Sequence, residues 1–208
     1  MRRSARCWAA LPAPPGLPEP FQRSQFGARV GGPLLKDRLF YFFDGERTLQ
    51  HEQAPVLVAP PFDQFSGHFP SPYHENNLMA KADYELTPSI RTFYRFSYFQ
   101  NFLAANGGSG FSVYAGKNIT RNHVAGLDFG SGSLSHSIRF GYLKAERDIT
   151  DATQGSNLPL ASYRLTLSMG NTGMNTGPNF VAPEVALQSK RQVKYDGSLT
   201  RGRNILRY

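Results

Sequence analysis

Two consecutive runs within residues 78–101 alternate between apolar and polar side chains, and a short turn at Pro88 joins them. The first run places Leu78, Ala80, Ala82, Tyr84 and Leu86 on one side and Met79, Lys81, Asp83 and Glu85 on the other. The second run places Thr92, Tyr94, Phe96 and Tyr98 opposite Arg91, Arg95, Ser97 and Asn101, with Phe93 and Phe99 interrupting the polar series. Because strand side chains point alternately to the two faces of a sheet, this period of two predicts an antiparallel hairpin. Alternation over about 10 residues per strand is typical of a barrel that crosses a membrane.

Further hairpins are indicated before and after this one. Residues 26–49 hold two extended runs around a polar turn at 36–38, and the second run is the aromatic stretch 39–43. Residues 125–142 alternate around a Gly-Ser turn, and residues 192–199 lead through a second glycine turn into a last run at 205–208. Aromatic and β-branched residues bounded by turn residues favour strands.

The connections between these runs alternate in length. Short connections are predicted at 36–38, 87–89 and 130–135, and long ones at 50–76, 101–121 and 147–191. Outer-membrane barrels have short periplasmic turns and longer external loops, so this asymmetry orients every hairpin the same way. We therefore predict an all-β fold, an antiparallel meander of about eight strands that is part of a transmembrane β-barrel with long extracellular loops.

Composition agrees with this fold class and limits the kinds of molecule that the chain is expected to bind. Charged residues make up 18% of the chain and aromatic residues 13%, with 20 glycines and 15 prolines, a profile that favours β structure over helices. No run approaches the roughly 18 apolar residues that a spanning helix needs. The net charge of +8 is scattered over hairpins and loops. We therefore expect outer-membrane lipid, and no nucleic acid, as a partner.

The first residues differ from the rest of the chain. A basic start is followed by Pro12, Pro14, Pro15 and Pro18, which interrupt the apolar stretch that a secretory signal requires. Residues 1–21 are therefore expected to be a disordered or artificial N-terminal segment without a convincing signal peptide.

The sequence contains no persuasive catalytic or metal-binding set. His51, His68 and His74 share one predicted loop, but their spacings are wide and no cysteine or carboxylate completes a ligand set. The stretch 170–177 is rich in glycine but lacks the Gly-Lys-Ser/Thr ending of a phosphate-binding loop. We expect no enzymatic activity and no cofactor.

The candidate functional residues are therefore those that the alternation assigns to the two faces of the barrel. The lumen-facing candidates are Asp44, Glu46, Lys81, Asp83, Glu85, Arg95 and Arg139. The lipid-facing candidates are Tyr84, Tyr94, Phe96, Tyr98, Phe140 and Tyr142, because tyrosines suit the membrane interface and apolar rings suit lipid.

The run FGARVGGPLLKDRLFYFFDGER resembles the opening barrel hairpin of TonB-dependent outer-membrane receptors, in particular the Oar-like subgroup with a carboxypeptidase-regulatory-like domain. The matching positions are Phe26, Gly27, Gly31, Gly32, Pro33, Lys36, Asp37, Phe40, Phe42, Gly45 and Glu46. The segment NNLMAKADYELTPSIRTFYRFSY is similar to the same group, in which a strand ending in Asp-Tyr-x-Leu-Thr-Pro precedes an aromatic-basic strand.

This resemblance implies that residues 22–208 are a partial TonB-dependent receptor barrel, covering about its first eight strands. Such receptors are 22-stranded barrels with a plugged lumen, and the TonB complex releases a bound substrate by pulling on the plug. The 208 residues contain no recognisable plug, TonB box or regulatory domain, so the full-length receptor would perform the uptake. The transported substrate is unknown, and the implied location is the outer membrane of a Gram-negative bacterium.

Two other functions fit the pattern of strands. The alternative in the same membrane is a small self-contained barrel with an adhesion or structural role, but its last strand, 205–208, is short for closure against the first. The other is a soluble ligand-binding barrel, which would dissolve without detergent.

Overall fold

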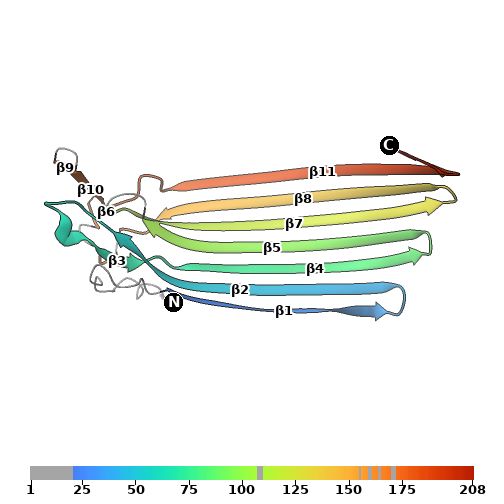
Figure 1. The fold of residues 1–208 in the computed structure, drawn as a ribbon, viewed down its shortest axis with the longest axis horizontal. Helices are drawn as coiled ribbons and strands as arrows, with labels where there is room; N and C mark the ends of the chain where they lie inside the picture. The colour runs from blue at the N-terminus through green and yellow to red at the C-terminus, as the bar shows by residue number, and fades with distance from the viewer. Residues whose placement is uncertain (1–20, 107–109, 155, 159–160, 164, 170–171) are drawn as a thin grey trace.

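The computed structural model describes residues 21–208 except 107–109, 155, 159–160, 164 and 170–171. Eight strands follow one another as neighbours in a single antiparallel sheet (Figure 1). They are β1 (Phe21–Leu35), β2 (Leu39–Val56), β4 (Tyr73–Thr87), β5 (Ile90–Asn106), β7 (Val113–Ser131), β8 (Leu134–Asp151), β11 (Glu184–Arg201) and β12 (Asn204–Arg207). The predicted all-β meander is confirmed. The expectation for residues 1–20 lies outside the described part of the chain, and β1 begins at Phe21.

Short turns join the strands at one end of the sheet, on the side where Figure 1 shows the tight reversals. Three of these turns contain a residue with positive φ: Asp37 at 57°, Gly132 at 60° and Gly202 at 59°. Aspartate and glycine tolerate the left-handed conformation that tight hairpin turns need. The polar turns predicted at this end are therefore present.

The opposite end carries all of the long connections, and these form a second, smaller structure. It contains the short elements η1 (Asp63–Phe65), β3 (Gly67–Pro70), β6 (Gly110–Phe111), β9 (Leu165–Met169) and β10 (Thr172–Thr176). β3 extends the edge of β2, while β6, β10 and β9 make a separate three-stranded sheet (Figure 1). We call this structure the loop cluster. Among the described residues, no helix has the length and apolar content of a membrane span.

The loop cluster has the main buried core of the described chain. Residues from all three long connections enter it, including Val58, Phe111, Leu158 and Met174. The rings of Phe69 and Phe111 meet edge to face at 4.7 Å between centroids. The connections therefore pack against one another.

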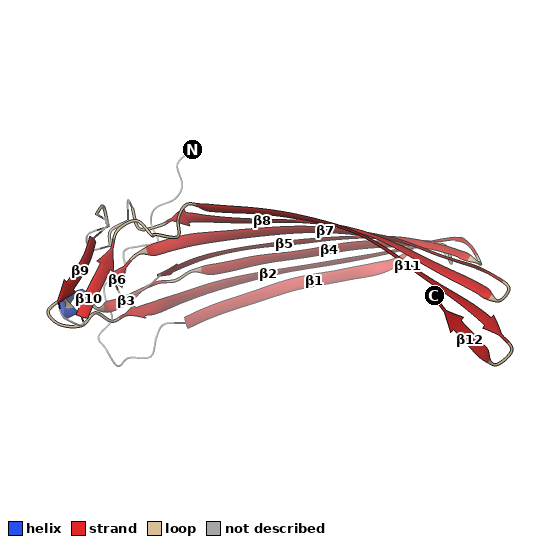
Figure 2. Ribbon diagram, turned by 90° about the horizontal axis from the view of Figure 1, so that it is seen from above, coloured by secondary structure: helices blue, strands red, loops and turns tan. Residues whose placement is uncertain are grey.

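The bounds predicted for the long connections were wrong, because the strands continue further than expected. β2 runs to Val56 and β4 begins at Tyr73, β5 runs to Asn106 and β7 begins at Val113, and β8 runs to Asp151 and β11 begins at Glu184. Polar residues such as the paired Asn101 and Asn118 interrupt the hydrophobic alternation at these points, while the backbone pairing of the strands continues beyond them. Figure 2 shows these long strands as one twisted sheet.

Register assigns every strand residue to one of two faces, because directly paired residues lie on the same side of a sheet. The apolar face includes Val30, Tyr41, Phe43, Leu78, Tyr94, Phe96, Leu127, Phe140, Tyr142, Val193 and Tyr195. The polar face includes Arg29, Asp44, Lys81, Asp83, Arg95, Asp128, Arg139, Lys194 and Asp196. Many apolar-face side chains have no protein over them, and Val193 is 71% exposed.

The apolar side chains form a band at the short-turn end of the apolar face. On β8 the band runs from Leu134 to Tyr142, which at roughly 3.3 Å per residue spans about 26 Å along the strand. The apolar belt of an outer-membrane barrel is about 25 Å tall. On the six strands β2, β4, β5, β7, β8 and β11, the first polar residue beyond this apolar band belongs to what we call the boundary row: Arg47, Asn76, Gln100, Arg121, Lys144 and Arg191.

Candidate functional site

The seven predicted lumen-facing residues all lie on the polar face, distributed over four strands. Asp44 and Glu46 are on β2, Lys81, Asp83 and Glu85 on β4, Arg95 on β5 and Arg139 on β8. They therefore form a row of charges across the sheet and not one compact cluster. That this face meets the lumen stays a prediction.

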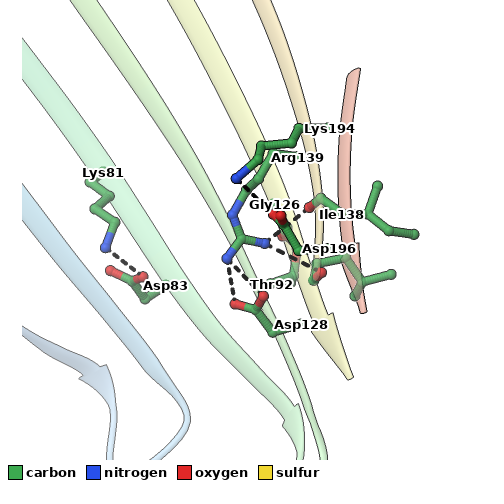
Figure 3. Close-up of polar contacts among 10 residues, drawn as sticks. Lys81, Asp83, Thr92, Gly126, Asp128, Ile138, Arg139, Lys194 and Asp196 are labelled. Carbon is green, nitrogen blue, oxygen red and sulfur yellow. Dashed lines mark hydrogen bonds and ion pairs between the residues drawn. The ribbon is translucent and has the colours of Figure 1, made fainter. Parts of the chain in front are cut away.

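Most of these charges have a partner of opposite sign on the same face. The closest pair joins Arg139 Nη2 to Asp128 Oδ1 at 2.7 Å, across β8 and β7 (Figure 3). Lys81 contacts Asp83 at 2.8 Å, which is two residues along β4. The remaining pairs are Arg91 with Glu85 at 3.3 Å, Lys194 with Asp196 at 2.9 Å and Arg29 with Asp44 at 3.8 Å. The polar face is therefore a ladder of ion pairs.

Arg139 is the best-fixed cation of this ladder. Besides its ion pair with Asp128, its Nη1 donates to the backbone oxygen of Ile138 at 3.0 Å (Figure 3). Its guanidinium carbon lies 5.1 Å from the ring centroid of Phe93, and Lys81 Nζ approaches the same ring at 5.3 Å. Phe93 thus lies between two cations that its π face attracts.

Phe93 also covers a glycine on the neighbouring strand. Gly126 is its direct partner on β7, and a Cβ built on Gly126 would come within 3.0 Å of three carbon atoms of the Phe93 ring. This contact explains why an aromatic residue interrupts the polar series of β5. The sequence signal for it is the glycine inside a strand, which marks a close approach.

Arg95 differs from the other charges of the polar face. Its direct partner on β4 is Lys81, which contacts Asp83 instead. The buried Nε of Arg95 has no hydrogen-bond partner among the described residues. Like charges placed opposite one another in a sheet are unfavourable, so the pairing with Lys81 does not neutralise the positive charge of Arg95.

The six predicted lipid-facing residues all lie on the apolar face, inside the apolar band. Tyr84 is on β4, Tyr94, Phe96 and Tyr98 are on β5, and Phe140 and Tyr142 are on β8. The assignment of this face to lipid stays a prediction.

Two histidines on the apolar face, His123 and His136, were not predicted from the sequence as functional residues. Nδ1 of His123 lies 2.7 Å from the hydroxyl oxygen of Tyr94, and Nδ1 of His136 lies 2.7 Å from that of Tyr195. Each pair joins two neighbouring strands. The only sequence signal is a histidine on an otherwise apolar strand face, and its partner depends on register.

No described group of histidine, cysteine and acidic residues is arranged to hold a metal ion. The site is thus a charged strand face, an aromatic strand face and a packed loop cluster. This arrangement can sit between hydrocarbon and water, with the loops projecting into solvent.

A long-stranded antiparallel meander with one apolar face, one charged face, short turns at one end and loops at the other is the architecture of a transmembrane β-barrel. Residues 4–73 match the family described as Outer membrane beta barrel domain, and within the described chain this match covers β1, β2 and β3. Comparisons with curated proteins and with solved structures found no match. Fold and family match together support an outer-membrane barrel protein, located in the outer membrane.

Proposed function

We propose that the chain is part of the barrel of a TonB-dependent outer-membrane receptor of the Oar-like subgroup. In the complete receptor this barrel would serve the energised uptake of a substrate across the outer membrane. The observation that carries the proposal is the β1–β2 hairpin, because the residues that resemble the receptors' opening hairpin pair with one another in register. Gly27 faces Glu46, and Gly31 faces Phe42.

Two glycines of this hairpin lie where the neighbouring strand leaves no room for a side chain. A Cβ on Gly27 would lie 2.6 Å from the backbone oxygen of Gly45, and one on Gly31 would lie 3.0 Å from that of Tyr41. Both positions therefore disfavour larger residues. The motif encodes a specific close strand pairing, which supports using it as a family signature.

The open edges of the sheet support a larger barrel. In the described sheet β1 pairs only with β2, and β12 pairs only with β11. An unpaired backbone group in hydrocarbon costs several kcal/mol, so both edges need further strands when the sheet is in a membrane. The 22-stranded receptors close their sheet in this way.

In this proposal the loop cluster captures the substrate. It lies at the end of the sheet that faces the cell exterior when the short turns face the periplasm. Besides its packed core, it carries exposed apolar side chains that a substrate could contact, including Leu57, Tyr163 and Phe180. The plug and the TonB complex would then release the substrate into the periplasm.

The DNA on both sides of the reading frame provides the most direct test. We expect codons for a plug before the barrel strands and codons for further strands after them. The protein purified from outer membranes with detergent should show heat-modifiable gel mobility. If the protein behaves as such a barrel while the flanking DNA encodes neither plug nor strands, the self-contained barrel with an adhesion or structural role replaces this proposal.

A further inference from the structure

The boundary row carries an excess of basic side chains at one edge of the apolar band. Its members on β2, β7, β8 and β11 are Arg47, Arg121, Lys144 and Arg191, and those on β4 and β5 are neutral. The row lies on the loop side of the apolar band. Since outer-membrane barrels direct long loops outward, this edge belongs to the outer leaflet.

Three of these cations lie together on neighbouring strands. Arg121 and Lys144 are direct partners across β7 and β8, and Arg191 pairs with Tyr142, two residues from Lys144. Directly paired side chains in a sheet lie about 5 Å apart at Cβ. The three side chains can therefore reach one ligand, and we call them the basic triplet.

Glu146 holds two members of the basic triplet close to each other. Its carboxylate accepts from Arg121 Nη1 at 3.0 Å and contacts Lys144 Nζ at 2.8 Å. The side chains of Arg121 and Lys144 remain 38% and 45% exposed, so their charged ends are still accessible. One carboxylate against three cations leaves a net charge of +2 at the edge of an apolar surface.

We propose that the basic triplet binds the phosphate groups of lipopolysaccharide in the outer leaflet. The triplet lies on the face that we assign to lipid, so its ligand has to be anchored in the membrane. Guanidinium and ammonium groups bind phosphate oxygens through charge-assisted hydrogen bonds. Tyr98 and Tyr142 pair directly with Arg121 and Arg191, and this places aromatic rings beside the sugar and acyl portions of such a lipid. The proposal rests on the outer-membrane location and is independent of the transport function.

The test uses the protein as purified from outer membranes, kept in uncharged maltoside micelles, with native mass spectrometry counting bound lipid A. We expect tighter binding of diphosphorylated than of dephosphorylated lipid A. The variant Arg121→Gln/Lys144→Gln should lose about 30-fold in affinity, because each basic side chain near an anionic surface contributes roughly a factor of five. The matched control, Lys36→Gln/Arg203→Gln, removes the same charge from the short turns and should keep the affinity. The conservative variant Arg121→Lys keeps the positive charge and should therefore retain most of the affinity for lipid A.

Two results would overturn the proposal: equal affinity for both forms of lipid A, or an unchanged affinity in the double variant. Displacement of lipid A by millimolar inorganic phosphate would indicate a site for free anions instead, and would also overturn it. If the unmodified protein shows no heat-modifiable mobility, the outer-membrane location is wrong. This failure is distinct from a failure of lipid A binding.

A second measurement leaves the basic triplet intact, so it does not depend on the folding of the charge variants. A photo-cross-linker at Ser189, the direct partner of Lys144, should capture radiolabelled lipid A. The same group at Gln192, on the opposite face of β11, should not. Equal capture at both positions would contradict the site.

Discussion

The hydroxyl oxygen of Tyr94 lies 2.7 Å from Nδ1 of His123, across β5 and β7 in the apolar band. The rings of Phe96 and Tyr142 lie 5.0 and 6.0 Å from that of His123, so apolar and aromatic surface surrounds the pair. A ring nitrogen without a partner is costly in hydrocarbon. The tyrosine hydroxyl therefore makes a histidine compatible with this face.

Tyr94→Phe should destabilise the folded chain by about 1–3 kcal/mol in a bilayer, because Nδ1 of His123 loses its partner. Urea titration of protein reconstituted in phosphatidylcholine vesicles measures the change. Tyr98→Phe is the matched control, since the Tyr98 hydroxyl donates to Gln100 in the boundary row, where water can replace it. Equal losses for both variants would contradict a buried histidine pair.

Gly126→Ala should destabilise the sheet by about 1–3 kcal/mol, because the new methyl group clashes with the Phe93 ring and displaces it from Arg139 and Lys81. Gly141→Ala on the same face is the control, since its Cβ would meet nothing closer than 3.8 Å. Combining Gly126→Ala with Phe93→Leu should recover part of the loss. The same denaturant titration reports all variants, and a neutral Gly126→Ala would show that Phe93 does not pack there.

Strand positions and faces could be predicted because side-chain alternation is local. Leu78 and Phe96 reveal their face through their own neighbours in the chain. The loop-side ends of the strands were missed, since polar residues such as the hydrogen-bonded pair Asn101 and Asn118 interrupt the alternation while the strand pairing continues. The core around Met174 was missed as well, because it joins residues far apart in the sequence and no periodic pattern marks it.

For the candidate site, the sequence indicated which charges share a face but not how they pair. Arg139 and Asp128 meet because the register of β7 and β8 brings them together, and a shift of one residue would move them apart. Register also places Arg95 opposite Lys81, an unfavourable pairing that no local pattern reveals.

The ion pair between Arg139 and Asp128 should contribute little by itself. Its side chains are 31% and 43% exposed, so solvent screens the charges despite the 2.7 Å separation. A double-mutant cycle with Arg139→Met and Asp128→Asn should give a coupling free energy below about 1 kcal/mol, falling further in high salt. A coupling of several kcal/mol would mean that this face is sealed from water.

Met174→Ala should loosen the loop cluster while leaving the large sheet intact. Met174 is 0% exposed in the core, and truncating a buried methionine costs about 2–5 kcal/mol. Limited proteolysis should then cut the connections between the strands faster, with unchanged heat-modifiable mobility of the barrel strands. Leu57→Ala, at a position that is 75% exposed, should leave the cleavage rate unchanged. Simultaneous loss of loops and sheet would show that the two parts unfold together.

A pair of arginine substitutions tests which face meets lipid. Val193 is on the apolar face beside Phe140, and Ser137 is on the polar face between Asp128 and Asp196. Val193→Arg should cost about 2–4 kcal/mol in vesicles, because it places a charge at the depth of hydrocarbon. Ser137→Arg should change the stability by no more than about 0.5 kcal/mol, since carboxylates and water surround the new charge. The free energy of unfolding in vesicles decides between the faces: if Ser137→Arg is the more costly change, the polar face is the one against lipid and the assignment is reversed.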